Sequence, residues 1–210
     1  MRSKVISQPA IEPTTVDELK ASLRITQAAE DSLLQDYIRE ARIMAEKYTD
    51  RKFITQKIES YYDDLNIRQL GEWFSGAKRG TVKSICSGGL LDLQYGPAQS
   101  ITTFTLINYD NSESAYASTN YYLDNFSDES RPRIILDENS DPIFNLREEN
   151  GIKVEWVAGY GNNKTDVPSP IRRAIVMMAG QLYANRGDCD EASRLKFCSI
   201  LDSYKYFNGL

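Results

Sequence analysis

Acidic residues and cysteines are the side chains of this sequence whose chemistry could be catalytic. Asp63-Asp64 and Asp137-Glu138 are adjacent acidic pairs, and the chain has no histidine. General acid-base catalysis requires both carboxylates to face one substrate, whereas neighbouring residues of a strand point to opposite faces of its sheet. The absence of histidine also removes the commonest general base and the Ser-His-Asp and Cys-His nucleophile systems. We therefore predict no catalytic residues and no enzyme activity.

The sequence also lacks the spacing of a metal or cofactor site. The three cysteines, an odd number without a CxxC pair, predict buried free thiols rather than a disulfide framework or a zinc site; they are Cys86, Cys189 and Cys198. The acidic run at 188–191 lacks the ligand spacing of an EF-hand and fits the N-cap of a helix. Gly159-Tyr160-Gly161 does not lead directly into a helix, so it is no phosphate-binding loop. We predict no metal and no cofactor.

Length and charge favour a folded chain with weak affinity for nucleic acid. The 210 residues are 41% hydrophobic and 26% charged, which suits one or two compact domains. The net charge is −5, whereas DNA affinity comes mainly from clustered Lys and Arg. Residues 1–13 contain no apolar stretch long enough for a signal peptide, and no segment reaches the roughly 20 apolar residues of a membrane span. We expect a cytoplasmic chain without membrane contact.

Helical patterns lie near both ends of the chain. Thr15 and Glu18 have capping-box spacing and predict a short helix over about 15–23. Apolar residues at steps of three and four predict a longer helix over about 28–50. Pro168, Ser169 and Pro170 precede a third helix that ends near Gly187. A last helix is expected over about 190–206.

The middle of the chain has the pattern of strands. β-Branched and aromatic residues predict six strands without helices between them, which indicates an antiparallel β module; they lie at 54–64, 90–96, 100–109, 120–126, 133–137 and 151–161. The predicted fold class is therefore α+β, a helical bundle formed by the N- and C-terminal helices and interrupted by an antiparallel β insertion. The expected domains are an extended arm at 1–13, a helical bundle at 14–53 and 165–210, and a β-rich insertion at 54–164.

Two long loops of the insertion carry opposite charge. Residues 66–89 are rich in glycine and carry a net charge of +3, whereas 108–150 carry −7. The first loop also holds an aromatic pair and a basic pair that could bind a neighbouring protein or DNA: Trp73, Phe74, Lys78 and Arg79. These four residues are the interface candidates, and the alternative is a solvated hairpin that touches nothing.

Several short motifs resemble those of one family. Their order along the chain is similar to that of the head-tail connector, or neck adaptor, proteins of long-tailed phages; the matching segments are 15–20, 23–24, 30–31, 37–38, 48–51, 95–97, 156–161, 167–172 and 182–186. The motifs AGYG (158–161), VPSPI (167–171) and LYANR (182–186) carry most of the resemblance. The loops 66–89 and 108–150 are expanded against the family pattern.

The resemblance implies a structural role without catalytic residues. Copies of such proteins form a ring, usually of twelve, beneath the portal protein in the neck of the virion. The ring extends the DNA channel and offers a surface to the next neck or tail protein, while genomic DNA passes through the lumen without specific binding. Assembly is expected in the cytoplasm of the host bacterium. Two alternatives remain, namely another neck or tail subunit, such as a completion or terminator protein, and a DNA-binding regulator.

Overall fold

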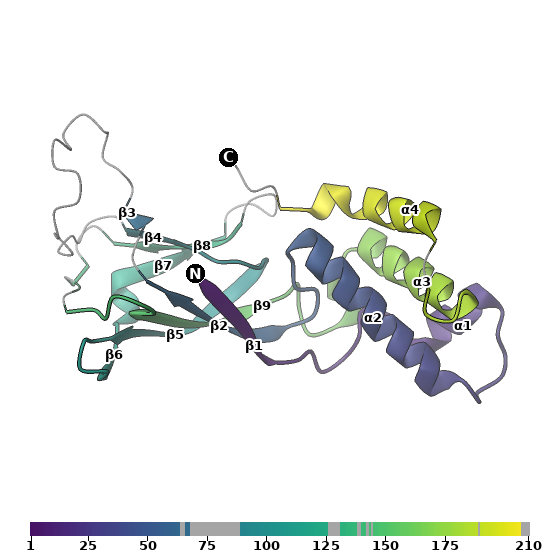
Figure 1. Ribbon diagram of the computed structural model, residues 1–210, viewed down its shortest axis with the longest axis horizontal. Helices are drawn as coiled ribbons and strands as arrows, with labels where there is room; N and C mark the ends of the chain where they lie inside the picture. Colours follow the sequence, from purple (N-terminus) through teal and green to yellow (C-terminus); the bar gives the residue numbers. More distant parts are fainter. Residues whose placement is uncertain are drawn as a thin grey trace. The chain divides into compact units, whose positions relative to one another are not determined.

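The chain folds into two units, one of helices and one of sheets (Figure 1). The computed structural model describes residues 1–63, 66–67, 89–125, 131–137, 140–141, 143, 145–188 and 190–206. We call one unit the helical unit; it comprises 8–56, 95–97 and 158–210. We call the other the sheet unit; it comprises 1–7, 57–94 and 98–157.

The part of the helical unit that the structure describes contains four α-helices. They are α1 Val16–Leu23, α2 Asp31–Thr49, α3 Ser169–Ala184 and α4 Glu191–Leu201. The predicted capping box is confirmed, because Glu18 N donates to Thr15 Oγ1 at 3.3 Å and Thr15 N donates to Glu18 Oε2 at 3.0 Å. The predicted N-cap of the last helix is also confirmed, since Ser193 N donates to the Asp190 carboxylate at 3.1 Å. One short 3₁₀ turn, Lys164–Asp166, precedes α3, and another, Asp202–Tyr204, follows α4.

The helices of this unit share one apolar core. The apolar stripe of α2 packs against that of α3, and buried side chains of α1 and α4 complete the cluster; its members include Leu19, Leu34, Ile38, Ala41, Ile171, Ile175, Met178, Leu182, Phe197 and Leu201. Gly180 of α3 lies against the side chain of Leu23, where an added Cβ would stand 3.3 Å from a methyl group. The glycine therefore serves a close approach of α1 to α3.

The sheet unit contains two sheets. The strands are β1 Arg2–Ser7, β2 Gln56–Tyr62, β3 Asn66–Ile67, β4 Gly89–Asp92, β5 Ala98–Ile107, β6 Glu113–Ala115, β7 Tyr121–Asp124, β8 Arg133–Leu136 and β9 Ile152–Ala158. A 3₁₀ turn at Ser118–Asn120 precedes β7. The larger sheet has the order β1-β2-β9-β5-β6, and the smaller has the order β3-β4-β8-β7. Figure 1 shows the smaller sheet lying over the larger one.

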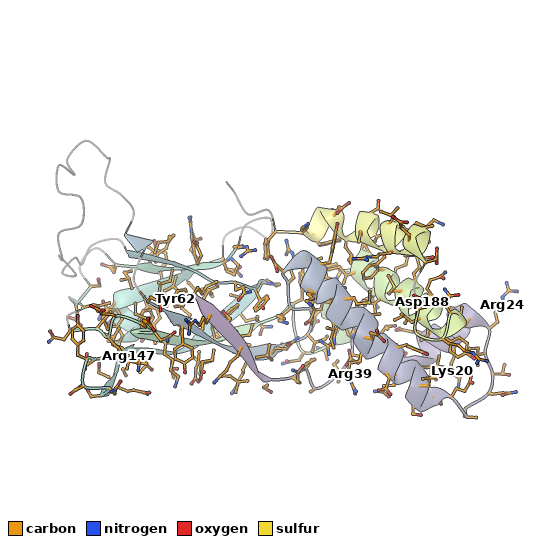
Figure 2. All side chains as sticks on the ribbon, viewed as in Figure 1. Lys20, Arg24, Arg39, Tyr62, Arg147 and Asp188 are labelled. Carbon is orange, nitrogen blue, oxygen red and sulfur yellow. The ribbon has the colours of Figure 1, made fainter. Side chains whose placement is uncertain are left out.

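Alternating side chains of the larger sheet form the core of the sheet unit. Every second residue of β9 is buried, and Trp156 is fully buried with its Nε1 donating to Ser60 Oγ at 3.1 Å. Tyr62 of β2 donates its hydroxyl hydrogen to the carbonyl oxygen of Asp92 in β4 at 2.8 Å. Figure 2 shows Tyr62 among the side chains of this unit. This bond ties the two sheets together.

The predicted fold class is wrong. The β structure is not an insertion in a bundle of terminal helices, because β1 precedes every helix and pairs antiparallel with β2 in the larger sheet. Pro9, Pro13 and the lack of periodicity in residues 1–13 predict an extended arm and do not indicate its pairing in a sheet. Pairing with β2 decides the structure of β1, since the partner strand satisfies the backbone groups that an isolated segment leaves to water. The fold contains α-helices and two β-sheets rather than one helical bundle with an insertion.

The first prediction concerns the N-terminal cap of α1. The side chains of Lys164 and Thr14 donate to the Glu18 carboxylate at 2.8 and 2.7 Å, and these bonds lower the pKa of Glu18 from 4.5 to about 2. Because the pKa of Glu18 is lower in the folded state, the ionised carboxylate makes its full contribution to stability above pH 4.5. This contribution is lost as the pH falls towards 2. We expect the difference in unfolding free energy between the wild type and Glu18→Gln to shrink over this range. Urea denaturation at stepped pH measures it, and a constant difference would contradict the assignment.

Candidate assembly surfaces

The part of the chain that the structure describes shows no cluster typical of an enzyme or metal site. No group of three or more His, Cys, Asp or Glu side chains among these residues is placed to hold a metal ion. Cys198 is a free, partly exposed thiol on α4, while Cys86 and Cys189 lie outside the described residues. Within the same described ranges, no helix is both long enough and apolar enough to cross a bilayer.

The interface candidates named from the sequence lie outside the described residues. They are Trp73, Phe74, Lys78 and Arg79, and their role stays a prediction. The candidate surfaces that the structure does describe belong to the end of α2, the exposed side of α2 and α4, and the edges of the larger sheet.

A buried carboxylate organises the end of α2. Glu46 is 4% exposed, and Arg42 Nη1 and Lys52 Nζ lie 3.2 and 3.0 Å from its oxygens. Gln56 Nε2 donates to the same carboxylate at 2.9 Å, and the Phe53 amide does so at 3.4 Å. Burial of a charge is costly unless cations and donors surround it, so these contacts fix the segment that follows α2.

A second buried cation joins distant segments of the helical unit. Arg51 is 2% exposed, donates through Nη1 to the Tyr160 hydroxyl at 3.1 Å and through Nε to the carbonyl of Tyr204. Its guanidinium also lies 4.0 Å from the ring centre of Tyr206. The Tyr206 ring leaves no room for a side chain at Gly96, where a Cβ would stand 2.1 Å from the tyrosine hydroxyl. Segments near residues 51, 96, 160 and 205 are therefore held together around one guanidinium.

The sequence pattern did not identify Arg42 and Glu46 of α2 as buried. Arg42 falls outside the apolar stripe of α2, which predicts exposure, yet it is 2% exposed and its Nε lies 2.7 Å from Glu12. The i, i+4 spacing of Arg42 and Glu46 was the available signal, but that spacing is equally common on solvent-exposed helix faces. Only the packing of residues 8–13 and 51–56 against α2 distinguishes the two cases.

A cavity opens beside α2 and α4. Its volume is about 300 Å³, and its lining combines apolar side chains, a thiol and two cations; the residues are Met44, Lys47, Tyr48, Arg194, Phe197 and Cys198. Ile43 on α2 and Leu195 on α4 are also exposed, at 49% and 64%. A cavity of this chemistry suits an apolar side chain of another protein with a carboxylate beside it.

The comparison with protein families identifies the chain's relatives. Residues 13–85 match the family model of the phage gp6-like head-tail connector proteins. The resemblance predicted from the motifs is thereby confirmed. The matched part contains α1, α2 and β2, together with the buried charges Arg42, Glu46 and Arg51.

Solved structures with the same fold come from gene transfer agent (GTA) particles. One chain, from the neck of an empty GTA particle computed with C6 symmetry, has 18% sequence identity and a TM-score of 0.76, and the match covers 100% of this chain and 98% of that one. Another, from the virion of a native GTA particle, has 18% identity and a TM-score of 0.74 with the same coverage. A third, from a native neck computed with C12 symmetry, has 18% identity and a TM-score of 0.68, covering 99% and 97%. No curated protein sequence matches the chain.

The second prediction concerns the buried charge on α2. We expect Glu46→Ala to lower the unfolding free energy by about 3–5 kcal/mol, because Arg42 and Lys52 would lose a shared counterion while Arg42 stays buried. Chemical denaturation of the isolated chain measures this change. The matched control is Asp36→Ala, which removes a pair with Arg39 on the exposed face of α2 (Figure 2). That pair should contribute less than about 1 kcal/mol. Equal effects of the two substitutions would contradict the role given to Glu46.

Proposed function

We propose that this chain is a structural head-tail connector subunit of a tailed phage or a related particle. The observation that carries the proposal is the family match over residues 13–85. The fold likeness to neck proteins extends over the whole chain and so includes α3, α4 and the strands β4 to β9, which lie outside the family match. The proposed location is the neck of the virion.

The subunit would work by assembling into a ring. A ring of identical chains requires a heterologous interface, in which one surface of a copy binds a different surface of the next. Twelve copies are the proposed number, and C6 and C12 symmetry were applied to the similar necks. The ring would dock on the portal protein and present its other side to the next neck or tail protein. Assembly would take place in the cytoplasm of the host.

The charge of the chain suits a conduit for DNA. A net charge of −5 disfavours tight phosphate binding, which depends on clustered cations. A lumen of this character would repel the duplex backbone and let the genome slide through. The absence of catalytic chemistry in the sequence is consistent with this passive role.

The third prediction tests the location and the ring. Electron cryo-microscopy of purified particles should place the chain in one ring layer between the portal and the tail. The physical reason is that a heterologous interface closes only at a fixed number of copies. A particle in which the chain occurs only along the tail tube, or not at all, would refute the proposal.

The fourth prediction concerns the glycine-rich loop. Trp73→Ala combined with Phe74→Ala should reduce the yield of assembled necks, because aromatic side chains are common anchors where two proteins bind. Lys78→Ala combined with Arg79→Ala is the matched control. It should have the larger effect, with a strong salt dependence, only if the loop contacts DNA. A normal titre of infectious particles from the aromatic variant would show that this pair is not an interface.

A further inference from the structure

The two outer strands of the larger sheet differ in chemistry. In the order β1-β2-β9-β5-β6, β1 and β6 are the end strands, and no other strand of the described residues pairs with their outer sides. An end strand presents unpaired backbone N–H and C=O groups and is a ready template for a strand of another chain. Both end strands belong to the sheet unit, so a single unit carries two possible docking edges.

The β1 edge is basic and aliphatic. Arg2, Lys4 and Ile6 are exposed, and Ile6 shows 49% of its surface. Lys4 lies 2.7 Å from Glu59 on β2, which compensates part of its charge, and its side chain is still 66% exposed. The strand therefore offers two cations and an apolar side chain to whatever covers it.

The β6 edge is acidic and aromatic. All three residues of β6 are exposed, including Glu113, and the preceding turn exposes Asp110 together with Tyr109, which shows 57% of its surface. The turn is held in place because Arg147 donates to Asn111 Oδ1 at 3.0 Å and Tyr109 N donates to Asn145 O at 3.1 Å. Figure 2 shows Arg147 at the end of the sheet unit where Figure 1 places β6. The edge is therefore preformed.

The hydrogen bonds of β6 reveal which of its backbone groups are available. Asn108 N donates to Ser112 O, and Tyr116 N donates to Phe104 O, so the even-numbered residues of this segment face β5. In an antiparallel pair the bonding direction alternates along the strand. The N–H and C=O groups of Glu113 and Ala115 consequently point away from β5, towards the position of an added strand.

We propose that neighbouring copies of this chain join their larger sheets edge to edge, with β1 of one copy beside β6 of the next. The inference rests on the proposed ring and names its contact surface. Arg2 and Lys4 would face Asp110 and Glu113, and Ile6 would be covered. Pairing of two identical edges is disfavoured. Two β1 strands side by side would bring cations close to cations, and two β6 strands would bring carboxylates close to carboxylates. A contact between two different edges is the heterologous kind that closes a ring.

Cross-linking in assembled necks tests the pairing. In a background with Cys86→Ser, Cys189→Ser and Cys198→Ser, particles are made with Lys4→Cys, Glu113→Cys or both, and are treated with a short bis-maleimide. The doubly substituted chain should give a ladder of linked copies on a denaturing gel. Particles that contain a mixture of the two singly substituted chains should give linked pairs and nothing larger. Either single variant alone should stay unlinked, as should Glu40→Cys combined with Glu113→Cys, because Glu40 lies on the exposed face of α2.

Charge exchange gives an independent readout. Arg2→Glu with Lys4→Glu should lower the yield of necks at least tenfold, and adding Asp110→Lys with Glu113→Lys to the same chain should restore it. A ring seen by microscopy without any cross-link would refute the edge pairing and leave the proposed function intact. Links formed by Lys4→Cys alone would also refute it, since they require β1 beside β1. Absence of the chain from the neck would refute both proposals.

Discussion

The buried charge cluster at the end of α2 is the constraint on which the helical unit depends. A carboxylate that is 4% exposed is tolerable only where cations and donors surround it, and Glu46 obtains them from its own helix and from residues 52–56. Arg51 adds a second requirement, because its guanidinium must find oxygen atoms and an aromatic face in segments far along the chain. Apolar contacts are not directional and allow these segments to shift relative to one another. Hydrogen bonds to a buried ion are directional and restrict such shifts.

The sheet unit is stabilised by an apolar core. Its buried side chains alternate along β9, and the Tyr62 hydroxyl connects the two sheets. Among the described residues, the larger sheet of this unit has two outer edges without a pairing strand, one basic and one acidic. In the proposed ring, each of these edges would be covered by the edge of opposite charge on a neighbouring copy.

Charge distribution connects these features to the proposed role. The net charge of −5 disfavours tight binding to the DNA backbone, and in the proposed edge pairing local clusters of opposite sign would steer one copy towards the next. The cavity beside α2 and α4 is a further surface with positive charge, because Lys47 and Arg194 are part of its lining. A connector needs this combination, since it must bind proteins firmly on several sides and still let a polyanion pass.

The sequence by itself determined the four helices, most strands and the family, because helix caps, apolar periodicity and motif order are local properties. Thr15, Glu18 and Asp190 act at the helix starts for reasons that lie within one turn of chain. The tertiary structure alone decided that residues 2–7 form a strand, which corrected the fold class, because that strand exists only through its pairing with β2. It also decided that Arg42, Glu46 and Arg51 are buried, since burial of a charged side chain depends on segments that pack over it from elsewhere in the sequence. Both edges of the larger sheet likewise emerge only from the strand order, which no local pattern encodes.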